Sequence, residues 1–157
     1  MKSSVRRVQE ALAARGFSFQ VREFPESTRT AAEAAVAVGC ALGQIAKSLV
    51  FRARRADRAV LAIASGANRV DEAALSALVG EPVSRADATF VRAKTGFAIG
   101  GVAPIGHLEP PIVAIDRDLM QYDEIWAAAG TPRAVFCLAP TDLVNLTGGQ
   151  VAHIKQD

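Results

Sequence analysis

The sequence has 157 residues, of which 50% are apolar and only 6% aromatic, and its formal net charge is +2. Its longest apolar runs, residues 59–64 and 134–139, are far shorter than the roughly 18 residues that cross a bilayer, and residues 1–7 lack the apolar block of a signal peptide. Because its two cysteines suggest no disulfide framework, we expect one soluble, cytoplasmic domain with an aliphatic core.

The N-terminal part of the sequence predicts two helices and a strand. The first helix is expected to begin at Ser3 or Ser4, whose hydroxyl can cap it, and to end at Gly16. Apolar and polar residues alternate over residues 17–22, which predicts a half-buried strand. The segment Thr30-Ala-Ala-Glu33 has the form of a capping box and therefore predicts the start of a second helix.

The rest of the sequence predicts more strands than helices. Residues 46–53 and 58–64 are expected to form a hairpin, and Asp71 and Asp87 are expected to cap two helices on either side of a short strand near Val83. Residues 122–130 are compatible with helix or strand. Further strands are predicted at 111–116, 134–138 and 151–154, and a further helix at 141–146. Because regular βαβ crossovers are missing, residues 1–157 are predicted to form one compact α+β domain with a mixed β-sheet and flanking helices.

Several common catalytic motifs are absent from the sequence. Neither His107 nor His153 has a partner at zinc-binding spacing, so no metal site is expected. A phosphate-binding P-loop needs glycine directly before Lys47, where the chain has Ala46. There is no Gly-x-Ser-x-Gly elbow, and nothing in the sequence places a histidine beside Cys40 to make it a nucleophile.

Two features nevertheless suggest a site. Lys47 enters an apolar strand, where a lysine either reaches water at the end of the strand or serves a bound ligand. Gly100 and Gly101 open a loop, and paired glycines either make a tight turn or let backbone amides approach a carbonyl that becomes negative. Taken together, the two features favour a site for acyl-group chemistry.

Four segments of the chain, taken in order, resemble the YbaK family, the free-standing relatives of the editing domain in bacterial prolyl-tRNA synthetase. They are Thr30-Ala-Ala-Glu33-Ala-Ala, Ile45-Ala-Lys47-Ser48-Leu-Val-Phe51, the stretch from Thr95 through Gly100-Gly101 and Pro104 to His107, and Leu138-Ala-Pro140-Thr-Asp142-Leu143. The resemblance implies a single α+β domain that hydrolyses the ester between a wrong amino acid and its tRNA, most often proline tRNA.

By position, the resemblance assigns catalytic roles to Lys47, Gly100 and Gly101. It assigns substrate contacts to Phe24, Thr30, Ser48, His107, Ala128, Ala129 and Gly130. Lys47 would hold the terminal nucleotide or the aminoacyl group, and the glycine amides would hold the ester carbonyl, so neither a metal nor an organic cofactor is needed. His107 would either bind the end of the tRNA or satisfy a nearby backbone carbonyl.

The resemblance thus implies a trans-acting aminoacyl-tRNA deacylase, with aminoacylated proline tRNA and prolyl-tRNA synthetase as partners and neither membrane nor DNA. The alternative is a module of the same fold that binds tRNA or a synthetase without hydrolysis. The loop at residues 128–131 is mostly aliphatic, which predicts selection by shape for small side chains such as alanine or 2-aminobutyrate. The arginines of residues 52–58 are candidates for tRNA contact or ordinary solvated surface.

Overall fold

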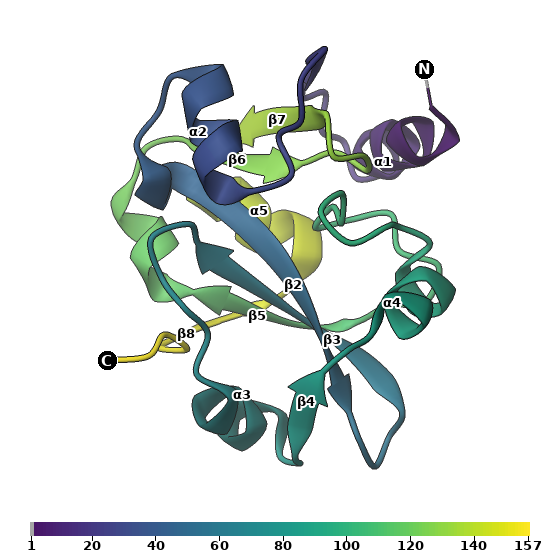
Figure 1. The fold of residues 1–157 in the computed structure, drawn as a ribbon, viewed down its shortest axis with the longest axis vertical. Coiled ribbons are helices and arrows are strands. Elements are labelled where there is room, and N and C mark those ends of the chain that lie inside the picture. Colours follow the sequence, from purple (N-terminus) through teal and green to yellow (C-terminus); the bar gives the residue numbers. More distant parts are fainter. Residues whose placement is uncertain (1) are drawn as a thin grey trace.

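Residues 2–157, the part of the chain that this computed structural model describes, fold around one mixed sheet (Figure 1). Its strands are β1 (Val21–Glu23), β2 (Ile45–Ala53), β3 (Arg58–Ser65), β4 (Val83–Arg85), β5 (Ile112–Asp116), β6 (Ile125–Ala128), β7 (Ala134–Leu138) and β8 (Gln150–Ala152). They lie in the order β1-β7-β6-β2-β3-β5-β8, with β4 also paired to β2. The pairs β2–β6, β3–β5 and β5–β8 are parallel and the other pairs antiparallel, so the predicted mixed sheet is confirmed.

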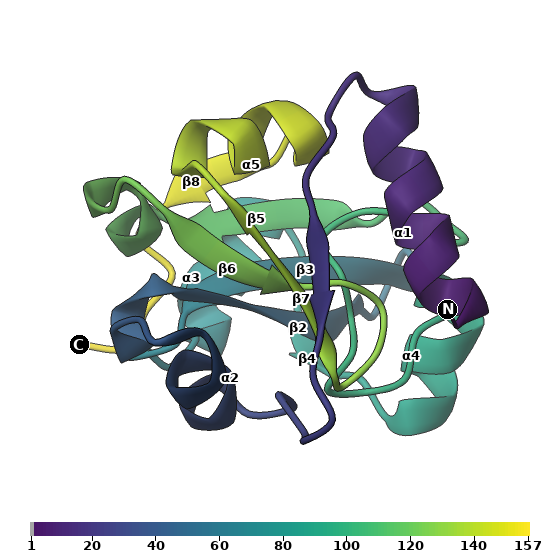
Figure 2. The same cartoon turned by 90° about the horizontal axis from the view of Figure 1, so that it is seen from above.

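Helices cover both faces of the sheet (Figure 2). They are α1 (Ser3–Ala14), α2 (Ala31–Val38), α3 (Glu72–Val79), α4 (Ala88–Thr95) and α5 (Pro140–Thr147), with 3-10 turns at Leu42–Gln44 and Arg117–Gln121. Among the described residues, no helix is both long enough and apolar enough to cross a membrane.

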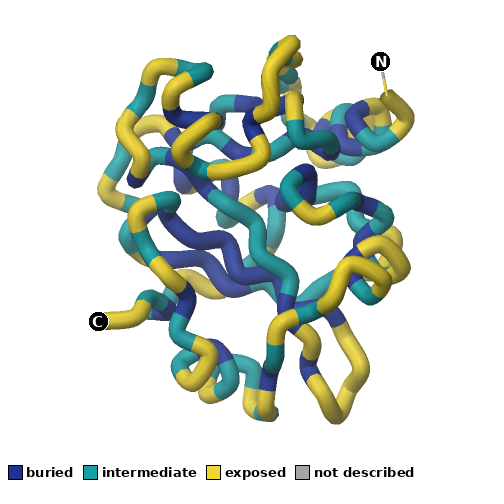
Figure 3. The backbone as a smooth tube through the Cα atoms, viewed as in Figure 1, coloured by how far each residue is buried: buried dark blue, intermediate teal, exposed yellow. Residues whose placement is uncertain are grey.

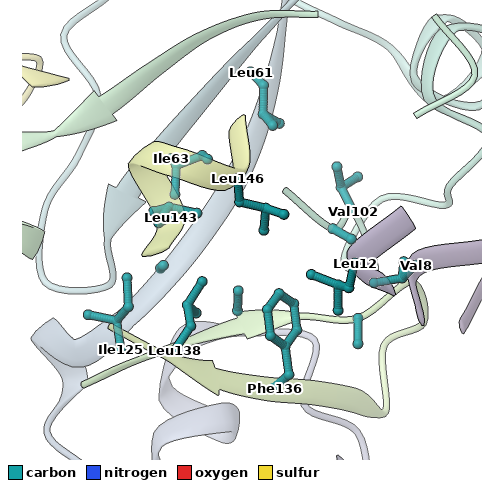
Figure 4. Packing of buried hydrophobic residues seen from close by; sticks show 14 of the residues in the cluster. Val8, Leu12, Leu61, Ile63, Val102, Ile125, Phe136, Leu138, Leu143 and Leu146 are labelled. Carbon is teal, nitrogen blue, oxygen red and sulfur yellow. The ribbon is translucent and has the colours of Figure 1, made fainter. Parts of the chain in front are cut away.

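The central strand β3 separates two apolar clusters. Leu61 and Ile63 point to the side of α1 and α5, in the cluster drawn in Figure 4. Ala62 and Ala64 point to the opposite side, where they pack in a cluster with Leu75 of α3. Because both faces are covered, β3 is buried almost throughout, as the tube in Figure 3 shows.

The helix starts predicted from capping residues are mostly confirmed. The Thr30 hydroxyl accepts a hydrogen bond from the Glu33 amide, and the Glu33 carboxylate accepts one from the Thr30 amide, both at 3.1 Å. Asp71 caps α3 through the amide of Ala73 at 2.9 Å, and Asp87 caps α4 at its N-cap position. These local hydrogen bonds fix where α2, α3 and α4 begin.

Two N-terminal predictions are wrong in detail. Helix α1 begins at Ser3 as predicted, but Lys2 stands at its N-cap and no side chain caps it, so neither serine hydroxyl has the predicted capping role. The strand expected at residues 17–22 begins only at Val21. Phe17 and Phe19 stack at 5.3 Å between ring centroids and pack on the core, so their alternation reflects packing without strand pairing.

The C-terminal elements are close to those predicted. The ambiguous segment 122–130 contains strand β6, because Trp126 and its neighbours pair with both β2 and β7. The last strand, expected at 151–154, occupies Gln150–Ala152 instead. These pairings join residues far apart in sequence and bring the elements of one cavity together.

Candidate active site

A cavity of about 370 Å³ opens beside β2, between the N-terminus of α2, strand β6, helix α4 and the loop around Gly100. Five of the residues predicted for the site line it: Thr30, Lys47, Ser48, Gly100 and Ala128. They come from four separate segments of the chain. The fold therefore brings half of the predicted site residues to one cavity.

Two of the other predicted residues, Phe24 and His107, lie outside this lining. The ring of Phe24 packs under the Arg22 guanidinium, whose central carbon lies 5.1 Å from the ring centroid. His107 contacts the Ala103 carbonyl through Nε2 at 2.6 Å and meets the Phe97 ring edge-on. Because a carbonyl oxygen only accepts, Nε2 donates this hydrogen bond, and burial lowers the pKa of His107 below its ordinary 6.5.

Gly101, Ala129 and Gly130 also lie behind the cavity wall. Ala129 is fully buried in the cluster under α1. Gly130 is pressed against α1, where an added Cβ would lie 2.7 Å from the Ser4 carbonyl oxygen. The Gly101 amide donates to the Ala98 carbonyl at 3.0 Å, so this N–H is already engaged.

Gly100 is held in a conformation that other residues rarely adopt. Its φ is +91°, and an added Cβ would collide with the side chain of Arg29. The two loops that carry Arg29 and Gly100 therefore touch at the cavity wall. A glycine at position 100 allows this contact, and its backbone lines the cavity.

Lys47 provides a half-buried ammonium group in the cavity. Burial, followed by the positive charge of Arg69, lowers its pKa from the ordinary 10.5, while the carboxylate of Asp116 acts in the opposite direction. Within residues 2–157, Lys47 forms no ion pair at 4.0 Å or less. The buried Asp116 carboxylate instead accepts hydrogen bonds from Ser65 and Asn68, at 3.0 and 2.9 Å.

The charge of the cavity lining is entirely positive. Arg29, Lys47 and Arg85 line it, and no aspartate or glutamate among the described residues does. The remaining wall is largely apolar and includes the indole of Trp126. Such a site favours a ligand with negative charge or with charge that becomes negative during reaction.

A second hollow of about 330 Å³ shares Arg85 and Ala86 with the first. Arg52 and Arg54 also line it, and the Arg52 guanidinium lies 5.1 Å from the ring centroid of Phe90. Arginines beside a partly exposed aromatic ring such as Phe90 can bind phosphates and stack on bases. The two hollows adjoin and are mainly basic, although Asp87 also lines the second and Arg52 is paired with Asp57 at 2.6 Å.

The lining residues that sequence reasoning missed include Arg29, Arg85 and Trp126. Arg29 and Arg85 each lie next to a predicted element, but no local pattern distinguishes them from surface arginines. Across residues 2–157, no group of three or more His, Cys, Asp or Glu side chains could hold a metal ion.

The chain is similar to one protein family and to several known proteins. A family model described as an aminoacyl-tRNA editing domain matches residues 25–146. A crystal structure described as "a putative trans-editing enzyme for prolyl tRNA synthetase" is 51% identical, with a TM-score of 0.94 over 100% of this chain and 99% of that one. The hypothetical protein APE2540 is 29% identical, with a TM-score of 0.88 over 96% and 99% of the two chains. The uncharacterized protein YwhH of Bacillus subtilis (strain 168) is 31% identical over 131 residues, 83% of each chain.

Proposed function

Because the chain belongs to the aminoacyl-tRNA editing domain family, we propose that it is a trans-acting deacylase that hydrolyses the ester bond of mischarged proline tRNA. The observation that carries this proposal is the cavity beside β2, whose charged lining residues are Arg29, Lys47 and Arg85. An aminoacylated tRNA end brings phosphates and an ester carbonyl that becomes negative in the transition state. Both suit a positively charged, largely apolar cavity.

Lys47 is assigned the role of electrostatic partner to the reacting end of the tRNA. Its ammonium is half-buried and its pKa is lowered by burial, which means that the folded protein holds this charge at a cost. A ligand with negative charge next to Lys47 would offset that cost. We assign the contact with the ester carbonyl to Gly100, and two observations support this choice: its backbone lines the cavity, and the Gly101 amide is engaged elsewhere.

Apart from Lys47, to which we assign an electrostatic role, the cavity lining offers no side chain suited to act as a general base. Within the described residues it contains no His, Cys, Asp or Glu. An aminoacyl ester is already reactive, and the ribose hydroxyl next to the ester can help to position or activate water. The protein would then contribute orientation and charge stabilisation rather than a catalytic triad of its own.

Selection of the amino acid is proposed to depend on shape. Ala128 lines the cavity with a side chain that cannot form a hydrogen bond, beside the ring of Trp126. Such a wall favours small aliphatic groups, alanine and 2-aminobutyrate, over the proline ring. Because one methylene in an apolar pocket changes binding by about 1–3 kcal/mol, we expect a graded preference across small amino acids.

The test is a deacylation screen with purified protein and proline tRNA charged with alanine, 2-aminobutyrate, serine, cysteine, threonine or proline. We expect hydrolysis of the alanine and 2-aminobutyrate esters above the spontaneous rate, with the proline ester spared. Tight tRNA binding without hydrolysis of any ester would favour the alternative function, a non-catalytic module that binds tRNA or a synthetase.

A further inference from the structure

Strand β2 has a free edge inside the cavity. Strand β6 pairs with β2 only at Ile45 and Ala46, and β4 pairs with it only from Phe51 to Ala53. No strand in the described part of the chain pairs with residues 47–50 on that edge. Figure 3 shows the consequence, since β2 is only partly buried here while the neighbouring β3 is buried.

The register of β2 against β3 decides which backbone groups of residues 47–50 face the free edge. The Gly66 amide donates to the Ile45 carbonyl at 2.7 Å, continuing the antiparallel β2–β3 ladder. In an antiparallel pair the backbone groups of alternate residues point to the same neighbour. Lys47 and Leu49 therefore bond to β3, while Ser48 and Val50 turn their amides and carbonyls toward the cavity.

Of the four backbone groups on this edge, the amides and carbonyls of Ser48 and Val50, three have no hydrogen-bond partner within residues 2–157. The Ala86 amide donates to the Val50 carbonyl at 3.4 Å. The Ser48 amide, the Ser48 carbonyl and the Val50 amide remain, in a row of donor, acceptor and donor on a wall that both residues line. The Ser48 hydroxyl is also buried without a hydrogen-bond partner. Unpaired polar groups in a partly buried wall are costly unless a ligand or solvent satisfies them.

We propose that this free edge, Ser48 to Val50, binds the α-amino and carbonyl groups of the aminoacyl ester, as an edge strand binds one residue of an added strand. The proposal rests on the deacylase function and deepens it. An aminoacyl group carries an N–H donor and a carbonyl acceptor two atoms apart, which matches the edge. The Ser48 carbonyl accepts from the amine, and the Ser48 or Val50 amide donates to the carbonyl.

This contact explains how one cavity can hold several amino acids in the same position. Every α-amino acid except proline presents the same primary amine and carbonyl, so main-chain recognition fixes the ester without reference to the side chain. The side chain is then selected only by the space around Ala128. The substrate class is therefore small α-aminoacyl esters as a group.

The decisive experiment replaces single backbone amides of β2 by esters, which removes an N–H and leaves the side chain unchanged. Separate proteins carry the exchange at Ser48, at Val50 and, as the matched control, at Leu49. Because the Leu49 amide bonds to β3, its exchange should lower Tm, whereas exchange at Ser48 or Val50 should lower it less. For hydrolysis of proline tRNA charged with alanine, we expect a loss of about tenfold in kcat/KM at Ser48 or Val50.

Losses below about fivefold at both positions would overturn the inference, and larger losses at either position support it. A fall in Tm at Ser48 and Val50 equal to that at Leu49 would also overturn it, since their amides would then be engaged in the fold. Failure of the unmodified protein to hydrolyse any ester would overturn the deacylase function itself. The two failures are therefore distinguishable.

Discussion

At the scale of single residues, Lys47 stands out because the fold does not stabilise its charge. Its pKa is lowered, chiefly by burial, whereas the hydrogen bond to Asp118 raises the pKa of Lys155. A lysine with a lowered pKa is charged at neutral pH at a cost to the folded state. Between that lowered pKa and the ordinary value of 10.5, the unfolded chain binds more protons, so stability rises with pH.

We therefore expect Lys47→Met to have a Tm equal to or above that of the unmodified protein at pH 7. Its stability should also rise less as the pH approaches 10. Lys155→Met is the control, and it should lower Tm because it removes an ion pair with Asp118 at 2.9 Å. Thermal unfolding of the three proteins at several pH values measures both effects. A clear fall in Tm for Lys47→Met would instead indicate a structural role for this lysine.

At the scale of elements, Gly100 in its loop differs from a glycine that only ends a helix. Gly80 ends α3 with φ of +88°, close to the +91° of Gly100, but an added Cβ at Gly80 meets no atom within 4 Å. Alanine at either position should cost about 1–2 kcal/mol of the free energy of unfolding, because both backbones are left-handed. Only at Gly100 does the new Cβ collide with Arg29 inside the cavity wall.

We accordingly predict that Gly100→Ala lowers deacylation at least tenfold, while Gly80→Ala leaves kcat/KM within about twofold at a similar loss of stability. Chemical denaturation measures the stability, and hydrolysis of proline tRNA charged with alanine measures the activity. Equal activity of the two variants would remove Gly100 from the proposed site.

Helix starts could be predicted from the sequence where the residues that cap a helix lie next to it in the chain. The side chains of Thr30, Asp71 and Asp87 cap the amides of the helices that follow them, so the chain itself marks where α2, α3 and α4 begin. The strand expected from Phe17 was misplaced because the stacking of Phe17 on Phe19 and the packing of Phe19 on Phe136 produce the same alternation as strand pairing. Side-chain periodicity reports burial, and it does not report hydrogen bonding.

At the scale of the whole molecule, the cavity depends on contacts that no local pattern contains. The free edge of β2 exists because β6 leaves it after Ala46 and β4 joins it only at Phe51. Lys47 and Gly100 could be selected from their residue types and from the resemblance to a family. Arg29 and Arg85 could not, because their place in the lining depends on how separate loops meet around β2.

Site residues that were assigned from the resemblance by their position in the sequence are subject to the same limit, because a match in sequence does not say where a side chain points. Ala128 lines the cavity, whereas Ala129, the residue directly after β6, is buried in the core cluster under α1. A resemblance in sequence identifies the segment 128–130 but does not say which of its side chains faces the ligand.

The central claim is that Lys47 serves hydrolysis of the aminoacyl ester and not folding. Its most direct test is single-turnover hydrolysis of proline tRNA charged with alanine, with the unmodified protein and Lys47→Met each in excess over tRNA. Removing one electrostatic partner of a developing negative charge should slow hydrolysis by about 10²–10³-fold, with Tm unchanged or raised. Equal rates for the two folded proteins would contradict the claim.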